Sequence, residues 1–269
     1  CRTCFTQQVI VRKGANLPSA IFRPSIISSI WKDGPPGWAD AFHGHGAIIG
    51  AMYTGALPCL PISSENPQTI LDCVPVDVVA NMMIICAWQR MIERNETIPV
   101  YHCCTSDLNP FNLQKFVDMA QKYAMEYPAE RFLAPPSFNI RGFRCIESLR
   151  HKMRARCLGP ALDKLTEALG HKPFWTELYC KVASAYEMLL PFTRYYHFES
   201  TNMLKLIDSM DEEDKKTFDF DVRKIDWYGY SSNGILGLKT FLLRDDVVDV
   251  RSIRKAKIKL FFISLIATR

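Results

Sequence analysis

Several groups of residues have types and spacing that could carry out chemistry. The glycine-rich stretch from Gly44 to Gly50 (GHGAIIG) is superficially similar to a dinucleotide-binding turn. Such a turn joins a strand to a helix N-terminus and lets the backbone approach a pyrophosphate closely. The residues before Gly44 are typical of a loop and the glycine spacing is wrong, so we do not expect a nucleotide there. No GxSxG sequence selects a hydrolase triad among the Ser, His and Asp residues.

Two pairs of residues have a spacing that a metal ion could use. His43 and His45 could share a metal, but no third ligand is near them in the sequence, and solvated or capping histidines explain them better. Cys1 and Cys4 form a CxxC pair, and no second CxxC completes a zinc site. We therefore predict no metal. Asp77, near the start of an apolar helix, is interpreted as a helix-terminus carboxylate and not as a catalytic acid.

Short apolar runs alternate with helix signals in the first half of the chain. Residues 19–28 and 99–106 predict buried strands. Residues 76–92, which follow Pro75, predict a helix that is too densely apolar for the surface and should be buried on most sides. A second helix should be capped by Asn109, begin at Pro110 and end at Pro128. This alternation predicts an α/β protein with a parallel sheet.

The residues between the first strand and the first helix predict a long loop. Residues 31–46 (WKDGPPGWADAFHGHG) are rich in Gly and Pro, and they contain two Trp. Long loops of this kind are often functional.

The second half of the chain is predicted to be mostly helical. Strand-like runs disappear beyond about residue 140, and helix signals follow one another closely. The residues that predict helix starts or ends are Gly170, Pro173, Pro191, Ser200 or Thr201, and the acidic run 211–214.

Composition and charge exclude some classes of protein. Of 269 residues, 48% are hydrophobic and 23% are charged, which is typical of a packed globular protein. The net charge is +5, and residues 244–269 carry +4 of it. A nucleic-acid-binding domain spreads Lys and Arg over a face that follows phosphates, so we expect no nucleic acid partner. The ten cysteines are scattered among apolar neighbours and indicate a reducing compartment.

The end of the chain combines a basic cluster with an apolar run. The run IKLFFISLIAT, residues 258–268, follows the basic residues between 251 and 257. We interpret it as the start of a truncated membrane segment whose basic flank favours the cytoplasmic side. The alternative is an amphipathic end helix packed on the domain. No run of 18 consecutive apolar residues spans a bilayer outright.

Six blocks of sequence, in order along the chain, resemble the fatty acyl-CoA reductases. The early blocks resemble the later half of that family's reductase domain, where RPSIV, a WKEP-like turn, PGW, VPVDVV and a YNCTSG-type strand recur. The later blocks resemble the family's C-terminal helical domain, and the coverage runs from about Gly14 to Leu243. The residues that carry the resemblance are Arg23–Ile27, Trp31–Asp33, Pro36–Trp38, Asp72–Val79, Tyr101–Pro110, and then Phe198, Asn202, Leu204, Asp214–Phe218, Asp221–Arg223 and Ile225–Trp227.

The resemblance implies a fold and an activity. Residues 1–140 would be the C-terminal part of a Rossmann-like, extended short-chain dehydrogenase domain, and residues 141–250 a mostly helical domain. Residues 251–269 would be the basic flank and the start of the membrane segment. The family reduces long-chain acyl-CoA to fatty alcohol with NADPH, so acyl-CoA and a cytosol-facing membrane, of the endoplasmic reticulum or peroxisome, are the expected partners.

The resemblance also implies that the proton donor is missing. The family uses a Tyr whose pKa is lowered by a Lys four residues later, and none of the ten tyrosines here has Lys at that position. Laid on the family pattern, the Tyr falls before Cys1 and the phosphate-binding turn lies further upstream. We therefore expect a piece of a longer enzyme with no catalytic residue of its own. The alternative, from a different class, is a non-catalytic membrane-associated binding or scaffolding protein derived from the family.

The remaining site residues are assigned by the resemblance. Pro24, Ile26 and Ile27 are expected to lie along the nicotinamide, and the alternative is that they only form a core strand. The loop with Trp31, Pro36, Gly37 and Trp38 is expected to form the mouth of an acyl channel, because a long hydrocarbon needs apolar walls. The alternative is that these tryptophans only anchor the loop.

Overall fold

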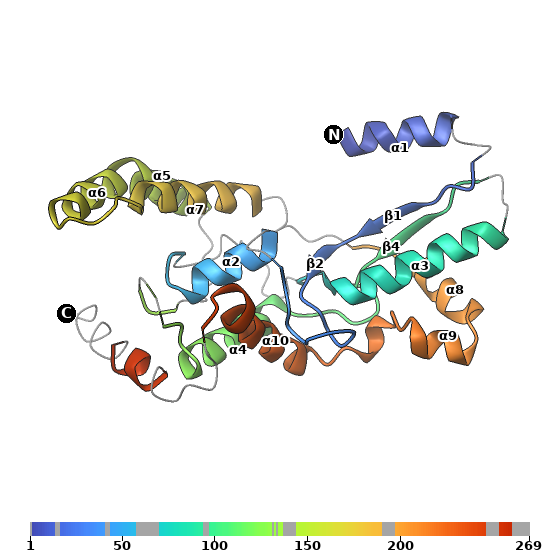
Figure 1. Cartoon of the computed structure of the whole chain (residues 1–269). Coiled ribbons are helices and arrows are strands. Elements are labelled where there is room, and N and C mark those ends of the chain that lie inside the picture. Colours follow the sequence, from blue (N-terminus) through green and yellow to red (C-terminus); the bar gives the residue numbers. More distant parts are fainter. Residues whose placement is uncertain are drawn as a thin grey trace. The chain divides into compact units, whose positions relative to one another are not determined.

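A computed structural model of the chain shows a mixed α/β protein (Figure 1). It describes residues 2–13, 17–40, 44–57, 70–93, 97–130, 132, 134–136, 144–189, 197–245 and 253–259. Its strands are β1 (Ile21–Pro24), β2 (Ile26–Ser28), β3 (Cys73–Pro75) and β4 (Val100–Cys103). The helices of the first half are α1 (Arg2–Lys13), α2 (Gly44–Tyr53), α3 (Val76–Ile92) and α4 (Leu113–Glu126). Those of the second half are α5 (Arg144–Met153), η1 (Arg154–Leu158), α6 (Gly159–Ala168), α7 (Trp175–Leu189), α8 (Thr201–Ser209), α9 (Glu212–Thr217), η3 (Val222–Lys224), α10 (Trp227–Gly237) and η4 (Leu238–Leu242), and residues 253–259 are also helical.

The strands pair in parallel, which confirms the α/β class. β1 pairs with β4, and β2 pairs with β3. The prediction of one strand over 19–28 is wrong in detail, because the chain changes partners at Ser25. The amide of Ser25 donates to the carbonyl of Cys103 after β4, whereas the amide of Ile26 donates to the carbonyl of Asp72 before β3.

Helix α3 has the predicted bounds but not the predicted burial. It starts at Val76 and ends at Ile92, and its inner face packs against the strands and the core. The opposite face is exposed and apolar, so the expectation of burial on most sides is wrong. The core contacts only one face of the helix, and the other face consists of Ala80, Met83, Ile84, Ala87, Trp88, Met91 and Ile92.

The contacts within the chain divide it into two compact units made of separate segments. Unit 1 comprises Cys1–Pro36, Ile70–Phe111 and Tyr196–Tyr230, and unit 2 comprises Gly37–Thr69, Asn112–Tyr195 and Ser231–Arg269. The domain boundaries at residues 140 and 250 stay a prediction. The core of unit 1 combines side chains of β3, α3 and β4 with side chains of residues 203–230. The α/β elements therefore share one hydrophobic core with α8 and with the segment from Phe220 to Tyr230.

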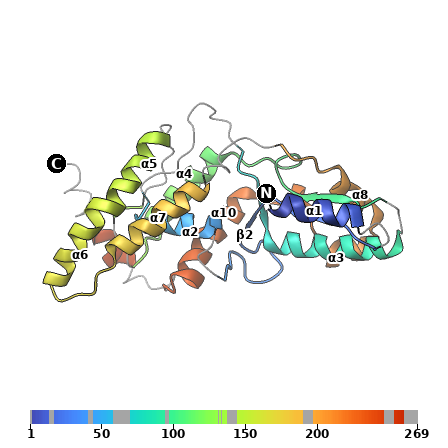
Figure 2. The ribbon, with the colours of Figure 1, turned by 90° about the horizontal axis from the view of Figure 1, so that it is seen from above.

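In unit 2, three helices of the second half pack together. Helices α5 and α6 follow one another end to end through η1, and α7 lies alongside them in both views (Figures 1 and 2). Gly159, at the start of α6, permits this packing, because a Cβ there would come within 2.9 Å of the Thr176 Cα in α7. The described residues after Cys103 form no further β-strand element, so the prediction of a mostly helical second half is confirmed for that part of the chain.

Two predicted helix boundaries are confirmed. Gly170 has a left-handed φ of 78° just after α6. Asp211 caps α9, and its carboxylate accepts hydrogen bonds from the amides of Glu213 and Asp214. Pro191, the predicted end of α7, lies outside the described residues.

Three predicted helix starts differ from the structure in detail. Helix α4 is capped by Asn112 rather than Asn109, whose amide group binds carbonyls near α10 instead. Helix α7 begins after Pro173, at Trp175. Ser200 precedes α8 as predicted, but its hydroxyl lies 3.2 Å from the thiol of Cys104 and makes no cap hydrogen bond.

The predicted loop over 31–46 is confirmed for residues 31–40, which form neither helix nor strand. Its last residues were assigned wrongly, because α2 begins at Gly44. No helix among the described residues is long and apolar enough to cross a membrane. The apolar run at the end of the chain lies outside the described residues from position 260 onward.

Candidate functional site

The residues expected to line a cofactor lie where the chain passes from one strand pair to the other. Pro24 ends β1 and is exposed, while Ile26 is half-buried and Ile27 is 47% exposed in β2. Among the described residues, no hydrogen-bond partner is found for the hydroxyl oxygens of Ser25 and Ser106, and both atoms are buried. Because Ser25 follows β1 and Ser106 follows β4, both hydroxyls belong to the carboxyl ends of paired parallel strands. Ligands of open α/β sheets bind at that edge.

The turn that follows β2 is held by a buried carboxylate. Asp77, only 7% exposed, accepts hydrogen bonds from three successive backbone amides. Its Oδ1 accepts from Trp31 at 3.0 Å, and its Oδ2 accepts from Lys32 at 2.9 Å and Asp33 at 3.0 Å. The expectation that Asp77 is not a catalytic acid agrees with this role, but its carboxylate holds a distant loop and does not cap its own helix.

The side chains of the same turn are fixed as well. Trp31 is half-buried and packs against the core of unit 1. The ammonium of Lys32 lies 4.3 Å from the centre of the Trp31 ring and 2.6 Å from the carboxylate of Asp219. Burial by itself raises the pKa of Asp219, but hydrogen bonds from Lys32 and Lys224 outweigh burial, and the pKa is lowered. The indole of Trp31 therefore has a defined place in unit 1.

Gly37 and Trp38 belong to unit 2, whereas Trp31 belongs to unit 1. Gly37 is buried with a φ of 79°, and a Cβ on it would overlap the carbonyl of Asn233 in α10. The reverse also holds, because a Cβ on Gly237 would overlap the carbonyl of Gly37. Only glycine satisfies both the backbone angle and the close approach at position 37. Trp38 beside it is 38% exposed.

A second carboxylate with the same function was missed by the sequence reasoning. Asp72, just before β3, accepts hydrogen bonds from the backbone amide and hydroxyl of Thr105 at 2.9 and 3.1 Å. It also accepts from the amide of Ser106 at 3.4 Å. The signal in the sequence is DCVPVD, in which a short apolar strand is flanked by an aspartate on each side. Each aspartate ties a different loop to a different end of β3.

The buried thiols of unit 1 are not suited to nucleophilic catalysis. Burial raises the pKa of Cys73 and Cys86 to about 12 and that of Cys104 to about 11. The thiolate is the reactive form, so these thiols are inert near pH 7. Cys104 lies 3.2 Å from the Ser200 hydroxyl, and a nearby Asp107 accepts the Ser200 amide, but this arrangement provides no base for a neutral thiol.

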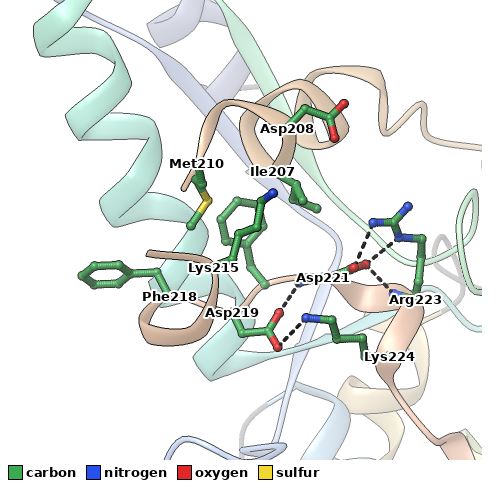
Figure 3. A pocket seen from close by; sticks show the side chains of 10 residues that line it. Ile207, Asp208, Met210, Lys215, Phe218, Asp219, Asp221, Arg223 and Lys224 are labelled. Carbon is green, nitrogen blue, oxygen red and sulfur yellow. Dashed lines mark hydrogen bonds and ion pairs between the residues drawn. The ribbon is translucent and has the colours of Figure 1, made fainter. Parts of the chain in front are cut away.

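A surface hollow of about 270 Å³ lies in unit 1 among α8, α9 and η3 (Figure 3). Two of its cations pair with carboxylates of the same lining: Lys224 with Asp219 at 2.9 Å, and Arg223 with Asp221 at 2.7 Å. Lys215 pairs with Glu212 at 2.9 Å. Because its cations are already paired with carboxylates, the hollow is not prepared for an anionic ligand. None of the residues expected to bind cofactor or substrate lines it.

The described residues contain no group of three or more His, Cys, Asp or Glu side chains that could hold a metal. His43 and Cys1 lie outside the described residues, as do the side chains of His45 and Cys4. Gly44, Gly46 and Gly50 are part of helix α2. The glycine-rich stretch from Gly44 to Gly50 is therefore helical and does not form a strand-to-helix turn.

Two sequence models of one family match the chain. Both carry the description male sterility protein; one, an NAD-binding model, matches residues 5–83, and the other matches residues 157–245. The first match includes β1, β2, β3, the 31–33 turn and the start of α3. The second includes most of the helical half.

Fatty acyl-CoA reductases of vertebrates are similar over nearly the whole chain. Fatty acyl-CoA reductase 2 of Homo sapiens is 30% identical over 245 residues, which are 91% of this chain and 47% of that protein. Fatty acyl-CoA reductase 1 of Gallus gallus is 30% identical over 250 residues, which are 93% of this chain and 48% of that protein. The same enzyme of Homo sapiens is 30% identical over 252 residues. The chain spans about half the length of these relatives.

Proposed function

Because the chain belongs to the family of male sterility proteins and fatty acyl-CoA reductases, we propose that it is part of an enzyme that reduces long-chain acyl-CoA to fatty alcohol with NADPH. The observation that carries this proposal is the similarity to fatty acyl-CoA reductases over more than nine tenths of the chain. The proposed fold is the later part of a Rossmann-like domain followed by a helical domain.

The residues at the strand ends fit a nicotinamide cofactor. The exposed side chains of Pro24 and Ile27 offer apolar surface for a flat ring, and the buried hydroxyls of Ser25 and Ser106 are available for polar groups. We assign Pro24, Ile26 and Ile27 to this contact. NADPH, when bound, supplies the hydride. The NAD-binding model covers these positions and supports a nicotinamide cofactor of this kind.

The acyl-CoA substrate is assigned to the loop after β2. The relatives of the chain are named fatty acyl-CoA reductases, and a long hydrocarbon needs apolar walls that exclude water. We assign Trp31, Gly37 and Trp38 to this role, with Gly37 shaping the loop and the two indoles supplying apolar surface. Attachment to a cytosol-facing membrane of the endoplasmic reticulum or peroxisome, through the apolar C-terminal run, belongs to the same proposal.

We propose that this chain by itself does not transfer hydride. The acid that protonates a developing alkoxide must have its pKa lowered toward the working pH. No Tyr here has the Lys four residues later that achieves this. Burial instead raises the pKa of Tyr53, Tyr101 and Tyr230. Since the relatives are about twice as long, the Tyr–Lys pair and the phosphate-binding turn are proposed to lie outside this sequence.

The test is an assay of the chain with palmitoyl-CoA and NADPH. We expect no hexadecanol by gas chromatography and no saturable change in NADPH fluorescence. A gene product that extends the chain with a strand-linked glycine turn and a Tyr followed four residues later by Lys should produce the alcohol. Turnover by the chain alone would falsify the proposal that the acid lies elsewhere. An extended product that contains the pair and yields no alcohol would contradict the reductase activity itself.

A further inference from the structure

We propose that Asp77 is a positioning residue that fixes the Trp31 indole where it contacts the acyl chain of a long-chain acyl-CoA. This inference rests on the proposed function, in which Trp31 forms part of the acyl-binding loop. It assigns a role to a buried carboxylate that the proposed hydride transfer does not use. The role is exerted through the backbone, because Asp77 binds the amide of Trp31 itself.

The carboxylate of Asp77 is committed to the turn. Its two oxygens accept three hydrogen bonds of 2.9 to 3.0 Å from the amides of residues 31, 32 and 33. Hydrogen bonds from backbone amides to a carboxylate are about twice as strong as neutral ones. With 7% of its surface exposed, Asp77 has little contact with solvent, so the amides are its main source of charge stabilisation. The carboxylate and the turn therefore hold each other in place.

Further side-chain hydrogen bonds restrain the same turn. Asn81, one helical turn after Asp77, donates from Nδ2 to Oδ2 of Asp33 at 2.7 Å and to the carbonyl of Asp219 at 3.3 Å. The ammonium of Lys32 binds the carboxylate of Asp219 at 2.6 Å. These bonds tie the turn to α3 on one side and to the segment before η3 on the other. The side chain of Trp31 is thus preorganised before any ligand arrives, which lowers the entropic cost of binding.

The position of the indole depends on the backbone bond. Trp31 is half-buried against the core, and the ammonium of Lys32 lies 4.3 Å from its ring centre. If the amides of residues 31–33 lose their common acceptor, the Cα of Trp31 is free to shift and the ring moves with it. Displacement of one wall of an acyl-binding site weakens contact with the hydrocarbon. It does not change contacts made by the CoA portion of the ligand.

The test compares Asp77→Asn with the wild-type chain. Asn has nearly the same shape but replaces one acceptor oxygen by an NH2 group, which faces amide donors and cannot accept from them. The measured quantity is the ratio of the Kd of acetyl-CoA to the Kd of palmitoyl-CoA, by equilibrium dialysis below the micelle concentration. These ligands share CoA and differ only in the acyl chain. A merely structural defect lowers the competent fraction for both ligands equally and leaves the ratio unchanged.

The chain offers a matched control in Asp163→Asn. Asp163 also accepts three successive amides, those of Phe174, Trp175 and Thr176, at 2.8 to 3.0 Å. It therefore holds another tryptophan-containing turn in the same way, but in unit 2 and outside the proposed loop. Circular dichroism and thermal unfolding establish that both variants remain folded.

We expect Asp77→Asn to lower the ratio at least tenfold, and Asp163→Asn to keep it within twofold of the wild-type value. An unchanged ratio in Asp77→Asn overturns the role of Asp77 and leaves the proposed function intact. If Asp163→Asn lowers the ratio as much as Asp77→Asn does, the role of Asp77 is also overturned, because the effect is then not specific to the turn at residues 31–33. If the wild-type chain binds neither ligand saturably, its proposed acyl-CoA site fails, and the role of Asp77 fails with it.

Discussion

At the scale of single residues, the contact between Gly37 and Gly237 makes a sharp prediction about stability. A Cβ on Gly237 would overlap the carbonyl group of Gly37, and backbone atoms cannot rotate away as a side chain can. We expect Gly237→Ala to lower the free energy of unfolding by roughly 1–3 kcal/mol, although alanine is the better helix former. The measurement is urea denaturation. Thr240→Ala, at an exposed helical position, serves as control and should stay within about 0.5 kcal/mol.

The buried thiols of unit 1 predict how stability depends on pH. Cys73 and Cys86 have a pKa of about 12 in the folded chain and ionise near pH 9 when unfolded. Above pH 9 the unfolded state releases these protons and the folded state keeps them, so stability falls as the pH rises. The expected slope is about 1.4 kcal/mol per pH unit for each such thiol.

The check is the urea midpoint measured between pH 8 and pH 9.5, below the pKa of about 10 at which exposed tyrosine side chains are half ionised. Cys86→Ala should show a smaller decrease than wild type, because one buried thiol is removed. A midpoint that stays constant over this range in the wild-type chain contradicts the prediction, since the thiols would then ionise equally in both states.

Single residues also show where reasoning from sequence reached its limit. The acidic cap at Asp211 and the turn glycine at Gly170 were predictable, because both act on their neighbours in the chain. The targets of Asp72, Asp77 and Asn109 were not, because each binds backbone groups more than 30 residues away. Composition and spacing encode local hydrogen bonds, but long-range partners depend on the folded arrangement.

At the scale of elements, α3 presents an exposed apolar face. A pair of neighbouring methionines in this helix can test whether that face is exposed in solution. Met82 is fully buried and Met83 is 51% exposed. Met82→Lys places a charge in the core and should unfold the chain or cost more than about 3 kcal/mol. Met83→Lys should change stability by no more than about 0.5 kcal/mol. It should also reduce self-association in sedimentation velocity, because exposed apolar patches promote association. Equal destabilisation by the two variants would show that this face of α3 is packed in solution.

The same helix illustrates what a periodic pattern determines. The bounds of α3 follow from Pro75 and from a long run without breakers, and they were predicted correctly. The burial of α3 was predicted incorrectly, because both faces of the helix are apolar and the pattern does not indicate which face packs against the core. Only Asp77 and Arg90 carry charge in this helix, and both are buried. The usual rule that charges mark the solvent side therefore fails here.

At the scale of the whole molecule, chain order misled the reading of architecture. The sequence changes from strand-rich to helical near residue 140, yet α8 and the segment from Phe220 to Tyr230 share a core with β4 and α3. Side chains of Met203, Leu206 and Phe220 are buried in that core. Patterns along the chain identify helices, but they do not reveal which distant segment each helix joins.

This shared core predicts that the strands and the helical segment 197–230 unfold together, and Asn109 provides the test. Its Nδ2 donates to the carbonyls of Val222 and Ile225 at 2.9 and 3.0 Å, and its Oδ1 accepts from the indole of Trp227 at 2.9 Å. Asn109→Ala leaves the two carbonyls without this donor, while the indole keeps the backbone carbonyl of residue 109 as an acceptor at 3.1 Å. The substitution should cost roughly 2–4 kcal/mol. Because one cooperative unit opens as a whole, amide hydrogen exchange in α8 and in β4 should accelerate by the same factor.

Asn112→Ala is the matched control, since Asn112 caps α4 in unit 2 and its loss should not change exchange in α8 or β4. If Asn109→Ala accelerates exchange in α8 while β4 keeps its protection, the helical segment opens independently of the strands. The common hydrophobic core would then not couple them. Equal acceleration would instead mean that the 31–33 turn, which is bonded to both α3 and Asp219, keeps its geometry only while both parts are folded.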